Sequence, residues 1–158
     1  MAMELHVLSD RLLRSITEWQ SAIDAERFPL RLAENVDFLS ARGFLPAQLA
    51  DKQIGFECFH DNARDTMAFL GEDNFDHRWR FALGFRWLGS KFEELQAAWM
   101  AATAYAAATS GVLFDHEEGK VLTFEQARET VRAIARDASA MESILDEVKR
   151  RFSASSGN

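Results

Sequence analysis

The chain contains few of the residues that cross-link or interrupt a fold. Its 158 residues include one cysteine, two prolines and eight glycines. A single cysteine, Cys58, cannot form an internal disulfide, so the disulfide-rich secreted class is excluded and a reducing compartment is expected. The low proline and glycine content excludes collagen-like chains and proline-rich disordered chains.

Positive charge is also scarce. Eighteen Lys and Arg stand against twenty-five Asp and Glu, which gives a formal net charge of −7. Nucleic acids are bound by clustered Lys and Arg, so this balance argues against a nucleic-acid partner. The first residues contain no cationic segment followed by an apolar stretch, so no secretion signal is expected and a cytoplasmic location is predicted.

One long stretch, from Leu95 to Phe114, contains no charged residue at all. Twenty residues are enough to cross a bilayer as a helix. Alanine supplies most of the stretch, however, and alanine brings little transfer free energy into a membrane. The stretch is therefore interpreted as a helix buried in a globular core, and no membrane partner is expected.

What the chain does contain is apolar mass. Hydrophobic residues make up 47% of it, with thirteen Phe and four Trp. A chain of this length forms about one domain with a substantial buried core. We expect a single globular domain over residues 1–152, followed by a frayed tail over residues 153–158.

The clearest periodic pattern is the alternation over residues 80–87, which predicts a strand. One face of this strand carries large apolar residues, namely Phe81, Leu83, Phe85 and Trp87. The other face carries small or cationic residues, namely Arg80, Ala82, Gly84 and Arg86. Further strands are predicted at residues 4–8, 30–32, 54–60, 112–114 and 121–122. Residues 34–53 are predicted to be irregular, because Gly43 and Pro46 interrupt them.

Two capping boxes predict helix starts, at Ser15–Glu18 and at Thr123–Gln126. The first helix should extend to about residue 27, and the last to about Phe152. The last has a core stripe of Val131, Ile134, Ala138, Met141, Leu145 and Val148. A third helix is predicted over residues 91–109, with Gly111 in the left-handed position after its end. The fold class is therefore α+β, with a mostly antiparallel sheet of about five to six short strands and three main helices packed on one face.

No catalytic motif withstands inspection, and we expect no enzyme activity. Residues 84–91 resemble a phosphate-binding loop, but the order is Gly-Ser-Lys and the strand alternation continues through it. Cys58 and His60 share a strand face, yet the neighbouring Glu57 and Asp61 would raise the thiol pKa rather than activate it. No metal-ligand spacing is present, so neither a metal nor a cofactor is predicted.

Acidic residues concentrate between Glu57 and Asp76, where six acids accompany one base, Arg64. Aromatic residues are interleaved with the acids, so the segment could steer and hold a basic protein partner. The candidate partner-binding residues are Asp61, Asp65, Phe69, Glu72, Asp73, Phe75 and Asp76. The alternative interpretation is an ordinary solvated connector. A second acidic cluster at residues 115–119, the predicted tip of a hairpin, matters only if the fold brings it beside the first.

A different hypothesis uses the opposite charge. Arg80 and Arg86, with Glu57 and His60 nearby, could bind an anionic small molecule. The competing interpretation is that the arginines pair with acids on neighbouring strands. A third option is a homo-oligomer in which the uncharged helix packs against a second copy.

A resemblance completes the sequence evidence. It is carried by Ser15, Trp19-Gln20, residues 23–26 and 28–32, Gly43-Phe-Leu-Pro46 and Gly55-Phe-Glu57, and later by Gly111-Val-Leu-Phe-Asp115 with Glu118-Gly119. In these the chain resembles small uncharacterised bacterial cytosolic proteins that are similar to immunity proteins of polymorphic or secreted toxin systems. The resemblance implies a protein that binds and blocks another protein, and it carries over no catalytic residue.

Overall fold

A seven-stranded antiparallel sheet forms the centre of the molecule. The computed structural model describes residues 2–156, and the strand order in the sheet is β2-β3-β4-β5-β1-β6-β7. The strands are β1 (Ala2–Ser9), β2 (Leu30–Leu32), β3 (Arg42–Leu49), β4 (Lys52–Asp61), β5 (Phe81–Leu88), β6 (Val112–Asp115) and β7 (Lys120–Thr123). The predicted α+β class is confirmed, with seven strands rather than five or six.

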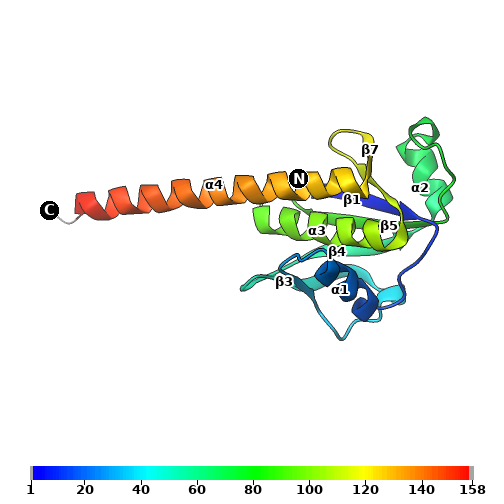
Figure 1. Cartoon of the computed structure of the whole chain (residues 1–158), viewed down its shortest axis with the longest axis horizontal. Helices are drawn as coiled ribbons and strands as arrows, with labels where there is room; N and C mark the ends of the chain where they lie inside the picture. Colours follow the sequence, from blue (N-terminus) through cyan, green and yellow to red (C-terminus); the bar gives the residue numbers. More distant parts are fainter. Residues whose placement is uncertain (1, 157–158) are drawn as a thin grey trace.

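Four α-helices accompany the sheet: α1 (Ile16–Ala25), α2 (Ala63–Leu70), α3 (Phe92–Thr109) and α4 (Phe124–Ser156). Helices α1 and α3 and the first part of α4 cover one face, as predicted, and α2 lies at the far end of the sheet from the tip of α4 (Figure 1). Helix α2 packs on the opposite face, against Leu8 and Ala82. It was not predicted, although its signal is present: the Asn62 side chain caps the helix by accepting a hydrogen bond from the Asp65 amide at 3.0 Å.

Strand β5 confirms the predicted alternation, shifted by one residue at each end. Leu83, Phe85 and Trp87 are buried among the helices. Trp19 of α1 packs at the centre of this core, edge-on to Phe85 and Tyr105, and its indole N–H donates to the Ala101 carbonyl at 3.0 Å. The buried indole N–H of Trp19 is thus satisfied, as the N–H of a buried Trp usually is.

The uncharged helix α3 is the most deeply buried element. Almost every residue from Ala97 to Ala106 is inaccessible to solvent, because the sheet, α1 and α4 all pack on it. This confirms the core interpretation, and it leaves little of α3 for a second copy. No helix within residues 2–156 is long and apolar enough to cross a membrane.

Residues 42–49 form a regular strand, β3, so the prediction of an irregular segment was wrong there. Pro46 is tolerated because it lies beside the end of the three-residue strand β2. Its carbonyl accepts from the Ala33 amide at 3.0 Å, one residue beyond the end of β2, so its nitrogen, which cannot donate, faces the place where β2 has ended. Because the edge strand β2 is short, no ladder hydrogen bond from position 46 is needed, and proline does not interrupt β3.

The end of α3 also differs from the prediction. Ser110, not Gly111, adopts the left-handed conformation, with φ of 56°. Gly111 is needed for a close approach instead, since a Cβ there would lie 2.4 Å from the Leu8 carbonyl oxygen.

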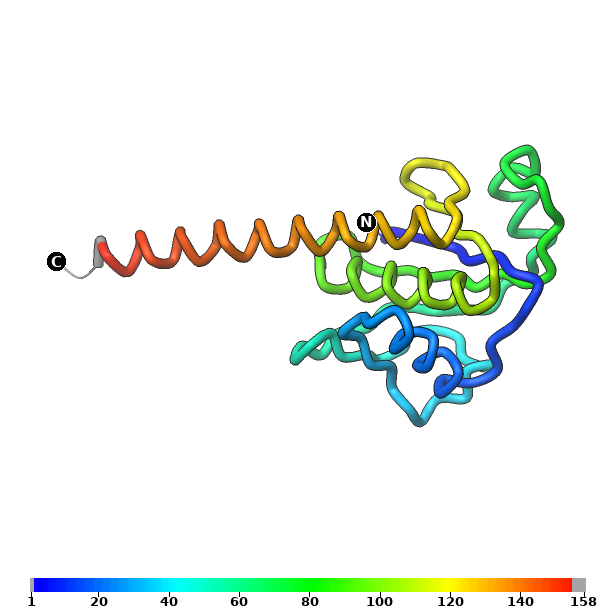
Figure 2. The backbone as a smooth tube through the Cα atoms, viewed as in Figure 1, coloured from blue at the N-terminus to red at the C-terminus, as the bar shows by residue number. Residues whose placement is uncertain are grey.

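Helix α4 continues far beyond the body of the molecule (Figure 2). Its predicted core stripe is only half correct: Val131 is buried and Ile134 packs on the core, but Met141, Leu145 and Val148 are exposed. Residues 153–156, predicted as part of a frayed tail, continue the helix, and residues 157–158 lie outside the described residues.

Candidate binding face

The face of the sheet opposite α3 is only partly covered, and its uncovered part is hollow. Helix α2 shields one end, and next to it lies a depression of about 750 Å³. We call this surface the open face. Its lining residues are Glu4 and His6 from β1, Arg42 and Gly43 from β3, Glu57, Phe59 and Asp61 from β4, Arg86 from β5, and Asn62, Asp65, Thr66 and Phe69 from α2 and its cap.

Strand alternation explains why these side chains gather here. Alternate residues of a strand point to opposite faces, and the residues next to these in sequence form the core under the helices. The side chains that point away from the helices are therefore those of residues 4 and 6 in β1, residues 57, 59 and 61 in β4, and residue 86 in β5. The register places Glu4 and Glu57 opposite Arg86, one on each side. Polar residues from three adjacent strands are therefore brought together without any local motif.

His6 is the centre of a polar chain across this face. Its Nε2 lies 3.1 Å from Asp61 Oδ2, and its Nδ1 lies 2.7 Å from Nε2 of His116. His116 comes from the tip of the β6–β7 hairpin, and its Nδ1 lies 3.8 Å from Glu4 Oε2. The hairpin tip is thus brought beside the first acidic segment, which is the condition under which we expected it to matter.

The hydrogen bonds determine which nitrogen of each imidazole donates and which accepts. If neutral His6 donates from Nε2 to the Asp61 carboxylate, its Nδ1 can only accept, so His116 donates from its own Nε2. One further proton, on His116 Nδ1, would face Glu4. Burial and the neighbouring His6 lower the pKa of His116, which favours the neutral form.

Arg86 is held by acids on both neighbouring strands. Its guanidinium donates to Glu4 Oε1 at 2.7 and 3.0 Å and lies 3.9 Å from Glu57. The hydrogen bonds and charge of Glu4 raise the pKa of Arg86 further. This arrangement matches the interpretation that the arginine pairs with acids across strands, and it leaves Arg86 little capacity for an incoming anion.

Phe59 forms the apolar part of the floor. Its ring lies over Gly84, where a Cβ would come within 2.3 Å of the ring carbon Cε2. The ring also lies 5.6 Å from the Arg86 guanidinium and edge-on to His6. Glycine at position 84 is therefore what allows an aromatic floor beneath the charged groups.

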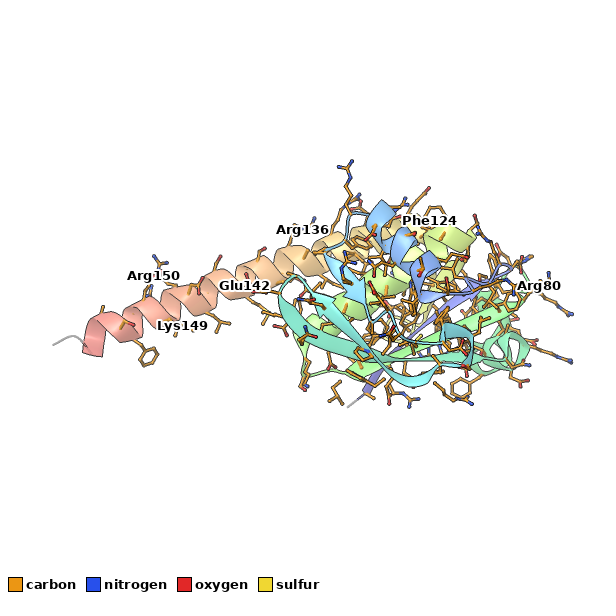
Figure 3. All side chains as sticks on the ribbon, turned by 90° about the horizontal axis from the view of Figure 1, so that it is seen from below. Arg80, Phe124, Arg136, Glu142, Lys149 and Arg150 are labelled. Atoms are coloured by element: carbon orange, nitrogen blue, oxygen red, sulfur yellow. The ribbon has the colours of Figure 1, made fainter. Side chains whose placement is uncertain are left out.

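The predicted anion strip is not continuous. Arg80 precedes β5 at the end of the molecule opposite the projecting tip of α4 and lies over Phe81, outside the hollow (Figure 3). Between Arg80 and Arg86, α2 covers Ala82 and Phe59 covers Gly84. His60 points to the opposite side of β4, where its Nε2 donates to the Phe38 carbonyl at 3.1 Å and burial lowers its pKa. Of the four residues of that hypothesis, only Arg86 and Glu57 lie together in the hollow.

The predicted acidic segment is divided by α2. Asp61, Asp65 and Phe69 line the open face, whereas Glu72, Phe75 and Asp76 line a separate depression. Asp73 is exposed in the short 3-10 helix Glu72–Asn74 that follows α2. Phe75 turns inward and packs on Phe114 with ring centroids 5.8 Å apart. Phe69 does the reverse and is 86% exposed. The segment is therefore not one uniform surface, since one of its aromatic side chains is partly buried and another is exposed.

Cys58 lies on the core side of β4 and does not reach the hollow. Burial raises the pKa of its thiol, so the thiol stays protonated. Within residues 2–156 there is no group of three or more His, Cys, Asp or Glu side chains placed to hold a metal ion.

Sequence reasoning missed Glu4, His6, His116 and Phe59 as members of one site. Glu4 and His6 did carry a signal, since two polar residues alternate with the core residues Leu5 and Val7. His116 carried none, because its position depends on the pairing of β6 with β1.

A second, smaller hollow of about 370 Å³ adjoins the first and shares Glu57 and Arg86 with it. Phe44 and Leu88 border it, and Phe44 is 62% exposed. The open face therefore extends from Phe69 at one end to Phe44 and Leu88 at the other, with charged groups between. Comparison of the chain with protein-family models, with curated proteins and with solved structures finds no match.

Proposed function

We propose that the open face binds a basic segment of a partner protein, without catalysis. The observation that carries this proposal is the exposure of Phe69, an aromatic side chain left in solvent at the border of an acid-rich hollow. Aromatic side chains at the border of a hollow are typical anchors of protein interfaces.

The charge balance of the hollow supports a cationic group from the partner. Glu4, Glu57, Asp61 and Asp65 contribute four negative charges, and Arg42 and Arg86 contribute two positive ones. Because Glu4 already neutralises Arg86, Asp61 and Asp65 are the acids best placed to attract a Lys or Arg side chain. An anionic ligand would instead have to displace Glu4 from Arg86.

The shape of the open face supports a peptide-sized contact. Apolar side chains stand at both ends, and the two adjoining hollows lie between them. A partner segment with apolar residues at its ends and a basic residue between them would fit this order. Toxin neutralisation is a more specific form of the same proposal, and it rests on the sequence resemblance alone.

The test compares matched variants of α2 and its following loop. Tagged chain is used to capture partners from its native cells, and the affinity for the captured protein is then measured at low and high salt. Phe69→Ala and Asp65→Lys should each weaken binding by about tenfold or more, and Asp65→Lys should also reduce the salt dependence.

Asp73→Lys is the charge-matched control, because Asp73 lies outside the hollow, and Leu39→Ala is the apolar control from a different surface. Both controls should bind as the wild type does. If Asp65→Lys and Asp73→Lys weaken binding equally, general charge attraction explains the interaction and the open face is not the site.

A further inference from the structure

The projecting half of α4 has a strict heptad pattern of small and apolar residues. Starting inside the core, the pattern follows alternating steps of four and three residues through Ala127, Val131, Ile134, Ala138, Met141, Leu145, Val148 and Phe152. An average repeat of 3.5 residues is the pattern of helices that supercoil around another helix.

The surroundings of this apolar stripe change along α4. Up to Ile134 the stripe packs on α3 and the rest of the core. From Met141 onward the apolar members are exposed: Leu145 is 55% exposed, and Ile144, beside the stripe, 63%. The ribbon shows this segment leaving the body, with Glu142, Lys149 and Arg150 on its sides (Figure 3). Residues 137–156 extend about 30 Å as a helix.

A helical segment of this length gains little stability in water without tertiary contacts. A long exposed apolar stripe on it indicates an interface. We infer that the projecting half of α4 pairs in antiparallel orientation with the same segment of a second copy of this chain.

The charge pattern selects both the partner and the orientation. Full antiparallel overlap of residues 137–156 places the twofold axis between Asp146 and Glu147. In this register Leu145 lies level with Val148 of the second copy, and Met141 lies level with Phe152. The flanking Glu142 then faces Lys149 of the second copy, and this pair occurs twice because the interface is symmetric.

A parallel pair would have the opposite electrostatics. It would place Asp137 beside Glu142 of the second copy on both sides, so two like-charge contacts would replace two opposite-charge contacts. The segment is complementary to its own reverse, which favours a second copy over an unrelated helix. The dimer forms at the end of the molecule opposite α2, so it leaves the hollow of the open face accessible.

The first experiment measures the mass of the full chain by sedimentation equilibrium. We expect a dimer at micromolar concentrations. Leu145→Asp should raise its dissociation constant by about 100-fold or more, because two charges enter the apolar layers. Ser143→Asp adds the same charge on the outward side of the helix and should leave the dimer unchanged. A wild-type chain that stays monomeric up to about 100 μM, or a dimer insensitive to Leu145→Asp, would overturn the proposal.

The second experiment tests the orientation by charge exchange. Lys149→Glu should weaken the dimer by about tenfold, and the double variant Glu142→Lys with Lys149→Glu should restore it. In a parallel dimer Lys149 would lie beside Ile144, so Lys149→Glu would have little effect and Glu142→Lys would tighten binding through Asp137. Those two results would refute the antiparallel arrangement. Variants Phe69→Ala and Asp65→Lys should not change dimerisation, so the dimer and the open face are tested independently.

Discussion

Replacing Thr103 by Val should make the protein more stable. Thr103 lies in α3 with no solvent exposure, and its hydroxyl has no hydrogen-bond partner within the described residues. A buried hydroxyl without a partner loses its hydration and gains nothing in return, which costs about 1–3 kcal/mol.

Valine has nearly the same shape as threonine and replaces the hydroxyl by a methyl group. Both residues are branched at Cβ and have similar helix propensities, so the helix itself should be unaffected. We therefore expect Thr103→Val to raise the free energy of unfolding by about 1–2 kcal/mol.

Thr109 provides a matched control in the same helix. It is also buried, but its hydroxyl donates to the Tyr105 carbonyl at 2.8 Å. Thr109→Val removes that hydrogen bond and should lower the free energy of unfolding by about 1 kcal/mol.

Urea unfolding followed by tryptophan fluorescence measures both variants, at one protein concentration so that any dimerisation contributes equally. Opposite signs are expected for the two threonines. If Thr103→Val is neutral or destabilising, the hydroxyl has a partner in solution and the reasoning about its burial is wrong.

Two further perturbations test the open face. Gly84→Ala forces the Phe59 ring away from Gly84 and should destabilise the protein by about 1 kcal/mol. In a double-mutant cycle, Gly84→Ala should cost much less in the Phe59→Ala background. Additive effects of the two substitutions would refute the contact. Burial lowers the pKa of both His60 and His116 from the ordinary 6.5, so as the pH falls through 6.5 the unfolded chain takes up protons first and stability should decrease. Urea unfolding at pH 7.5 and 5.5 measures this, since carboxylates titrate mainly at lower pH, and the loss should be smaller in His116→Gln. A constant stability across that range would contradict the assignment of neutral, partly buried imidazoles to His60 and His116.

Much of the fold could be predicted because its signals are local. The alternation that defines β5 and the caps at Ser15 and Thr123 depend only on neighbouring residues, and the structure places strands and helices there. Elements whose stability depends on distant neighbours were missed. β3 tolerates Pro46 only because β2 ends beside it, and the outer half of α4 is exposed only because α3 begins where it does.

The open face illustrates the same division. The sequence by itself determined the acidity of residues 57–76, the cationic side of β5 and the heptad pattern of α4, since each is a matter of composition and spacing. Only the tertiary structure decided that His6 meets Asp61, 55 residues away, and His116, 110 residues away. It also decided that Arg86 donates its hydrogen bonds to Glu4, so that the surface predicted as a candidate anion site is rich in acids. The physical reason is that strand order and register, which no local pattern encodes, determine which charges become neighbours.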